Sequence, residues 1–136
     1  LIAIILLGGH IMKKMIMWCK RHNIPYTVEN IGYNMECVRI YTDDIYSYSA
    51  ITNQLHKISN RNNWKIDTNY YSGVIRVYRY SDYEYLQEQD KNINTLVDLF
   101  YLTLREGKTQ EEAKQKQYQY AIDNNMLAAF DSLYNR

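Results

Sequence analysis

Two pairs of short segments with alternating apolar and polar residues constrain the fold of this chain more than any other feature. The first pair covers residues 26–31 and 35–42, and the second covers residues 64–70 and 74–80. Alternation with a period of two places successive side chains on opposite faces of a β-strand. The connections are "GYN" in the first pair and a turn at Ser72-Gly73 in the second, both short enough for antiparallel neighbours. The sequence therefore predicts two β-hairpins.

A segment with helical spacing precedes each hairpin. In residues 12–22 the apolar side chains recur at intervals of three and four, and this helix should end before Pro25. The same spacing recurs in residues 45–63, after the segment "TDD", whose side-chain oxygens can cap a helix start. The order α-β-β-α-β-β predicts an α+β domain at residues 12–80, with a four-stranded antiparallel sheet and both helices on one face. The core predicted on that face is Val38, Ile40, Trp64, Ile66, Ile75 and Val77.

The remaining residues, 81–136, predict a C-terminal helical extension. Their composition shifts to Gln, Glu, Lys, Asn and Asp, and Ser81 with Glu84 has the spacing of a capping box, so we expect the last strand to end at Tyr80. A further helix is predicted over residues 94–107, and another begins at a second capping box, Thr109 to Glu112. Short helices bury little apolar surface, so we expect them to dock on the sheet domain or on a partner.

Residues 1–11, "LIAIILLGGHI", are interpreted as an apolar appendage outside the fold. The run is shorter than the roughly 20 residues that span a bilayer, and it lacks the basic region and cleavage site of a secretory signal. We expect the native chain to start at Met12. The alternatives are a native β-strand that pairs with a sheet edge or with a second copy, and a leader cleaved after Gly9.

The charge and cysteine content exclude several classes of protein. Sixteen basic and fifteen acidic residues give a net charge of +1, so attraction of the whole molecule to a polyanion is not expected. Two cysteines without a CxxC pair favour reduced thiols and a cytoplasmic location, and no membrane association is expected. Ile, Asn, Lys and Tyr are abundant, and their AT-rich codons favour a low-GC bacterium or its phage as the source.

No motif of a known catalytic or cofactor site occurs in the sequence. The phosphate-binding loop, the dinucleotide fingerprint, the nucleophile elbow and the zinc-protease motif are all missing. Cys19 and His22 form a C-x-x-H pair, but structural zinc requires four ligands and only Cys37 remains as a further thiolate. We therefore expect no enzyme activity, no metal and no cofactor.

The strand phases place aromatic and basic side chains together on the sheet face away from the helices. Such a face can stack on bases and pair with phosphates, as single-stranded nucleic-acid platforms do. Tyr and Arg are also typical of protein–protein contacts, and cross-strand Tyr–Arg pairs stabilise an ordinary exposed sheet. The candidate binding residues are Arg39, Tyr41, Lys65, Tyr71, Arg76, Tyr78 and Tyr80.

These patterns lead us to expect a small non-enzymatic binding or regulatory protein, an accessory protein of a phage or mobile element. Its expected action is the occlusion of a macromolecular partner, another protein or a second copy forming a homodimer, by the Tyr/Arg face. The alternative is a single-stranded nucleic-acid-binding protein that uses the same residues. If that face is open, replacing Arg76 and Tyr78 should abolish binding and leave folding nearly intact. Ile75→Ala should instead destabilise the fold, because it truncates a core side chain.

Overall fold

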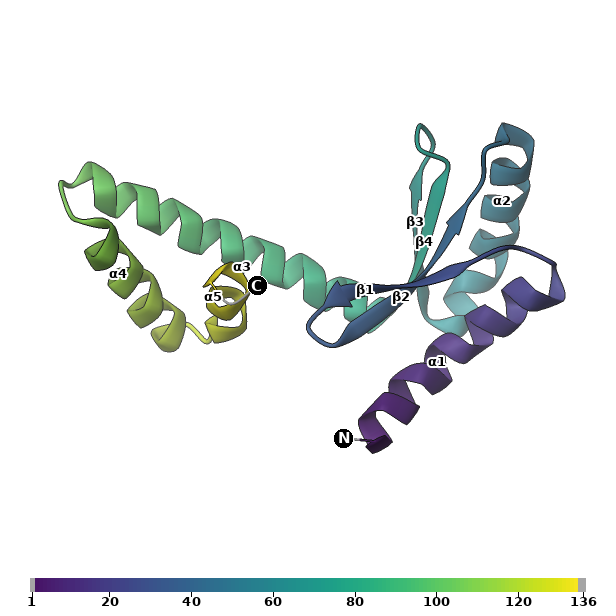
Figure 1. The fold of residues 1–136 in the computed structure, drawn as a ribbon, viewed down its shortest axis with the longest axis horizontal. Helices are drawn as coiled ribbons and strands as arrows, with labels where there is room; N and C mark the ends of the chain where they lie inside the picture. The colour runs from purple at the N-terminus through teal and green to yellow at the C-terminus, as the bar shows by residue number, and fades with distance from the viewer. Residues whose placement is uncertain (1, 135–136) are drawn as a thin grey trace. The chain divides into compact units, whose positions relative to one another are not determined.

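The structure, a computed structural model, describes the backbone of residues 2–134 and the side chains of residues 12–134. Within this range it confirms the predicted α+β fold, with five helices and four antiparallel strands in one sheet (Figure 1). The chain divides into two compact units, Leu1–Tyr83 and Glu84–Arg136. The elements are α1 (Ile2–Arg21), β1 (Thr27–Gly32), β2 (Met35–Tyr41), α2 (Ile45–Asn62), β3 (Trp64–Asn69), β4 (Val74–Arg79), α3 (Tyr80–Arg105), α4 (Gln110–Asp123) and α5 (Leu127–Tyr134).

The sheet of the first unit has the strand order β1-β2-β4-β3, and each neighbouring pair is antiparallel. The β1–β2 and β3–β4 pairs are the two predicted hairpins. The central pair, β2 and β4, joins one hairpin to the other, with Val38 opposite Val77 and Ile40 opposite Ile75. The sheet edges are therefore β1 and β3.

The sheet face covered by α1 and α2, here called the helix face, carries the core of the first unit. The six predicted core residues are all buried, and Ile66 is the most exposed of them at 8%. A shift of one residue in any strand would have turned its apolar set outward, so the predicted strand phases are confirmed. These strand residues pack against buried side chains of the two helices: Met12, Met15, Cys19, Tyr48 and Leu55.

Two connections meet at one end of the sheet. They are the β2–α2 link, residues 42–44, and the β3–β4 turn, residues 70–73, and the Thr42 backbone N–H donates to the Gly73 carbonyl at 2.9 Å. Gly73 has a φ of +70°, and a Cβ at this position would overlap the Thr42 carbonyl oxygen, so only glycine fits. Asp44 then caps α2 by accepting a hydrogen bond from the Tyr46 backbone N–H at 3.0 Å. The side chains at this end are thus carried by a fixed backbone.

Strand β4 passes directly into α3, and an ion pair holds the junction. Arg79 donates from Nε and Nη2 to the two carboxylate oxygens of Asp82, at 2.8 and 3.0 Å, and Asp82 is 5% exposed. The Tyr80 backbone N–H donates to the carbonyl of Asn63 at 2.8 Å. The first turn of α3 therefore has a defined position beside the sheet.

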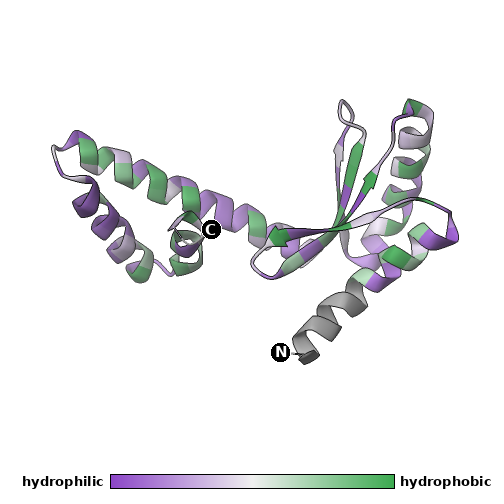
Figure 2. Ribbon diagram, in the orientation of Figure 1, coloured by the Kyte–Doolittle hydropathy of each residue, from purple (hydrophilic) through white to green (hydrophobic). Residues whose placement is uncertain are grey.

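The second unit contains the rest of α3 together with α4 and α5. Figure 2 shows hydrophobic residues recurring at intervals along α3, whereas α4 is mostly hydrophilic. Gln117 of α4 is 2% exposed, donates to the Leu96 carbonyl at 2.7 Å and accepts a hydrogen bond from the Tyr134 hydroxyl. The predicted capping box of Thr109 and Glu112 is present at the start of α4. The buried apolar residues of this unit's core are Leu96, Ala121, Ala129 and Phe130.

Helix α3 differs from the prediction, because it is one continuous helix of 26 residues. The sequence favoured a first helix from Ser81 and a separate one from Asn94. The polar residues between them, rich in Gln, Glu and Lys and free of Gly and Pro, are good helix formers and leave no reason for a break. The helix also begins at Tyr80, one residue earlier than expected, so Tyr80 does not belong to the fourth strand.

The backbone of residues 2–11 is helical and continuous with the rest of α1, and is not the β-strand considered as an alternative. The side chains of residues 1–11 lie outside the described residues, so the place of this segment in the native fold stays a prediction. Among the residues that the structure describes, no helix is long and apolar enough to cross a membrane.

Candidate functional site

The structure places five of the seven candidate residues on the sheet face opposite the helix face, here called the far face. The strand register puts Arg39 opposite Arg76, and Lys65 opposite Tyr78. Tyr41, at the end of β2, lies on the same face as Arg39 because it is two residues further along the strand. The other two residues are elsewhere: Tyr71 lies in the β3–β4 turn and Tyr80 is the first residue of α3.

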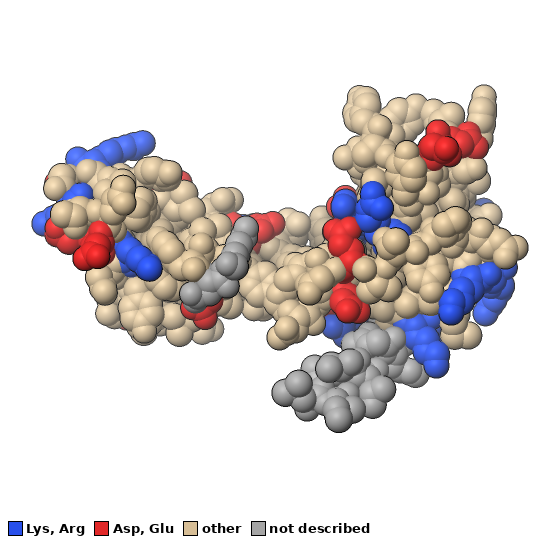
Figure 3. Space-filling view, in the orientation of Figure 1, with Lys and Arg blue, Asp and Glu red and all other residues tan. Residues whose placement is uncertain are grey.

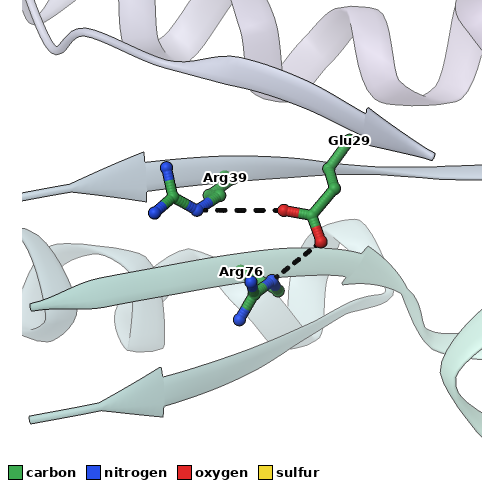
Figure 4. Close-up of polar contacts among 3 residues, drawn as sticks. All are labelled: Glu29, Arg39 and Arg76. Carbon is green, nitrogen blue, oxygen red and sulfur yellow. Dashed lines mark hydrogen bonds and ion pairs between the residues drawn. The ribbon is translucent and has the colours of Figure 1, made fainter. Parts of the chain in front are cut away.

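The two arginines of the far face share a single carboxylate of β1. Glu29 lies between them, 3.8 Å from Arg39 Nε and 3.3 Å from Arg76 Nε (Figure 4). Asp67 of β3 stands opposite Arg76 in the register, on the same face. The charges on this face are therefore largely balanced within the sheet, and both arginine side chains are 33% exposed. Because the arginines are already paired with a carboxylate, this face is poorly suited to binding phosphates.

Tyr78 is buried at 9% exposure, so the expectation of an open ring at this position is wrong. The cause is the first turn of α3, which places the Tyr83 ring 5.5 Å from the Tyr78 ring. The Lys65 ammonium lies 5.4 Å from the centre of the same Tyr83 ring. Burial also raises the pKa of the Tyr78 hydroxyl to about 12. Part of the far face is thus interior, and Tyr78 is a packing residue.

Several exposed tyrosines of the first unit lie instead at the sheet end where the β2–α2 link meets the β3–β4 turn. An open hollow of about 350 Å³ lies there, and we call it the tyrosine hollow. Four of its ten lining residues are tyrosines and two are aspartates. The lining residues are Tyr41, Thr42, Asp43, Asp44, Ile45, Tyr48, Tyr70, Tyr71, Ser72 and Gly73.

Three of the four rings that line the tyrosine hollow are exposed to solvent, and so is Tyr46 beside it in the chain. Tyr71 is 97% exposed, and Tyr46, which follows Ile45 in the first turn of α2, is 83% exposed. Asn69 holds the turn that carries the tyrosine pair, because its Oδ1 accepts from the Tyr71 backbone N–H at 3.1 Å. Tyr70 is 58% exposed and meets the Tyr71 ring edge to face. Large apolar rings held in this way on a fixed backbone are typical of contact surfaces.

The charge around the tyrosine hollow is negative. Asp43 and Asp44 line it, and among the described lining residues there is no Lys or Arg. Figure 3 shows an acidic area beside the start of α2, with no basic side chain next to it on the face drawn. Hydrogen bonds from the Ser47 hydroxyl and the Tyr46 backbone N–H lower the pKa of Asp44, so they favour its charged form.

The sequence candidates include only two of the ten lining residues of this hollow, Tyr41 and Tyr71. The pattern explains Asp43 and Asp44 as helix-cap residues. It places Ile45 and Tyr48 in a helix and Tyr70 at a strand end, so none of these was a surface candidate. The signal that could have found them is topological. In a sheet where β2 and β4 are antiparallel neighbours, the segment after β2 and the turn before β4 lie at the same end.

The second unit carries a larger open hollow of about 980 Å³, and two of its three lysines already have partners. Lys116 is 3.5 Å from a carboxylate oxygen of Glu106, and the Lys114 ammonium lies 4.5 Å from the centre of the Tyr134 ring. Among the residues whose side chains are described, no group of three or more His, Cys, Asp or Glu could hold a metal ion. The tyrosine hollow is therefore the better candidate site.

Comparison of the chain with protein-family models, with curated proteins and with solved structures finds no match in any of the three.

Proposed function

We propose that this protein is a small non-catalytic binding protein that occludes a protein partner through the tyrosine hollow and the side chains at its rim. The observation that carries the proposal is the set of exposed rings and the two carboxylates at the hollow, whose described lining residues include no basic side chain. Rigid, half-exposed tyrosines bury a large area at a low entropic cost, which makes them frequent anchors of protein interfaces.

The charge of the hollow favours a protein over a nucleic acid. Phosphates would approach Asp43 and Asp44 against like charge, whereas a protein can present basic side chains to them. The far face, with its Glu29-paired arginines, offers a nucleic acid little unpaired positive charge. We further propose that the protein comes from a phage or mobile element of a low-GC host, which rests on composition alone.

The test is selection of ligands from a random-peptide display library on the purified full chain. We expect selected peptides to bind, and to lose about tenfold or more in affinity when Tyr46 and Tyr71 are both replaced by alanine. Both rings are almost fully exposed, so the double variant should fold normally, which circular dichroism would check. Replacement of Tyr101 and Tyr120, exposed tyrosines of the second unit, provides a control of matched composition.

Two other measurements bear on the proposal. Sedimentation of the wild-type chain shows whether a second copy is the partner, in which case the tyrosine double variant should be monomeric. Fluorescence anisotropy with labelled single-stranded DNA and RNA at two salt concentrations addresses the alternative, and we expect no binding. Salt-sensitive binding that survives the loss of both rings would contradict the proposal.

A further inference from the structure

The tyrosine hollow combines aromatic ring faces with carboxylates, and that combination is suited to an organic cation. Ring faces carry the negative part of the aromatic quadrupole and attract guanidinium and ammonium groups. Asp43 and Asp44 add formal negative charge to the same wall. We propose that the hollow binds the guanidinium group of an arginine side chain on the partner, an inference that rests on the proposed function.

The ring geometry leaves aromatic faces open to such a group. Tyr48 and Tyr70 meet at 86° with centroids 6.0 Å apart, and Tyr70 and Tyr71 meet at 84° with centroids 5.7 Å apart. In an edge-to-face pair, one ring uses one face and the other uses only its edge. Because Tyr71 is 97% exposed, its ring offers surface on which a planar cation can stack.

The carboxylates favour arginine over lysine. The Asp44 carboxylate is held in place, since Oδ2 accepts from the Ser47 hydroxyl at 2.8 Å and Oδ1 from the Tyr46 backbone N–H at 3.0 Å. Asp43, the preceding residue, is exposed and lines the same hollow. A guanidinium can stack on a ring while its in-plane N–H groups reach a carboxylate, whereas an ammonium is more strongly hydrated and has no flat face.

The described residues that line the tyrosine hollow include no Lys or Arg, so none of them can supply the cation. On the far face, Arg39 and Arg76 are already paired with Glu29. In the hollow of the second unit, Lys114 and Lys116 have an aromatic ring and a carboxylate beside them. The tyrosine hollow differs from both surfaces, because its described lining has acidic residues and rings and no basic residue to neutralise them.

The experiment is titration of the full chain with N-acetyl-arginine methylamide, observed by NMR of protein carrying ring-labelled tyrosine. We expect saturable shifts of the Tyr70 and Tyr71 ring signals. The citrulline analogue, which has the same shape without the charge, should give none, and the lysine analogue should bind more weakly. Tyr71→Ala should weaken arginine binding about two- to fivefold, the range of an exposed cation–π contact. Asp43→Asn, which leaves the cap of α2 intact, should weaken it as well, whereas Tyr101→Ala should have no effect.

The display-selected peptides separate failure of this inference from failure of the proposed function. If the peptides depend on Tyr46 and Tyr71 and replacement of their arginine by citrulline abolishes binding, both proposals hold. If citrulline peptides bind equally well, or arginine and citrulline probes shift the rings alike, the guanidinium inference is overturned and the protein-binding function stands. If no selected peptide depends on Tyr46 and Tyr71, the proposed function itself fails.

Discussion

Replacement of Tyr78 by alanine should destabilise the first unit strongly, although the sequence pattern places this residue on the outer face of the sheet. Tyr78 is 9% exposed and contacts the tilted Tyr83 ring, with centroids 5.5 Å apart, so the change removes a buried ring and one aromatic pair. Truncation of buried aromatic residues to alanine typically costs about 3–5 kcal/mol. We expect a loss in that range, which is a large share of the stability of a unit of this size.

The matched control is Tyr71→Ala, the same chemical change at a ring that is 97% exposed. Its effect on the free energy of unfolding should stay within about 0.5 kcal/mol. The assay is urea unfolding followed by tryptophan fluorescence, because both tryptophans, Trp18 and Trp64, belong to the first unit. The signal therefore reports that unit alone.

A small and equal effect of the two substitutions would refute the reasoning. It would mean that the first turn of α3 does not cover Tyr78 in solution and that the far face is open. A large effect of Tyr78→Ala, with none from Tyr71→Ala, would establish that the packing of this turn on the sheet is part of the fold.

Three further predictions address single contacts. Burial raises the pKa of Tyr78 from 10.0 to about 12 in the folded state, so the unfolded state loses this proton first as the pH rises. Between pH 10 and pH 12 the free energy of unfolding of wild type should therefore fall by up to about 2.7 kcal/mol more than that of Tyr78→Phe. Urea midpoints that change in parallel for the two proteins would contradict this. Gln117→Leu should cost the second unit about 1–3 kcal/mol, since it removes the buried hydrogen bond to the Leu96 carbonyl and the one from the Tyr134 hydroxyl; thermal unfolding followed by circular dichroism checks it. Thr42→Val should stabilise the first unit by about 1 kcal/mol, because the Thr42 hydroxyl is buried without a hydrogen-bond partner, and a lower melting temperature would count against that reading.

The fold of the first unit could be predicted because its information is local and periodic. Alternation in the strands and three-four spacing in the helices both point to one side, and Val38, Ile40, Ile75 and Val77 are all fully buried there. The capping box at Thr109 was equally predictable, since its two residues are three apart in the chain. Each of these features depends on near neighbours.

The candidate site was less predictable because it depends on contacts between distant segments. Tyr78 has the phase of an exposed residue, and only the direct passage of β4 into α3 buries it. Glu29 neutralises Arg76 from a strand that is 47 residues away in the chain. The tyrosine hollow is lined by residues from the end of β2 and from the β3–β4 turn. The strand order brings these two segments together, and the periodicity of the sequence does not predict that order.

The strand order β1-β2-β4-β3 also bears on how fast the first unit folds. Each hairpin is local, but the central pair, with Tyr41 opposite Val74, forms only when the segment holding α2 closes into a loop. Hairpins form within about 1–10 μs, whereas non-local pairing must first overcome the entropy of loop closure. The slow step in refolding should therefore be the docking of two preformed hairpins. Val77→Ala, at the centre of that pairing, should slow refolding in stopped-flow fluorescence more than it speeds unfolding.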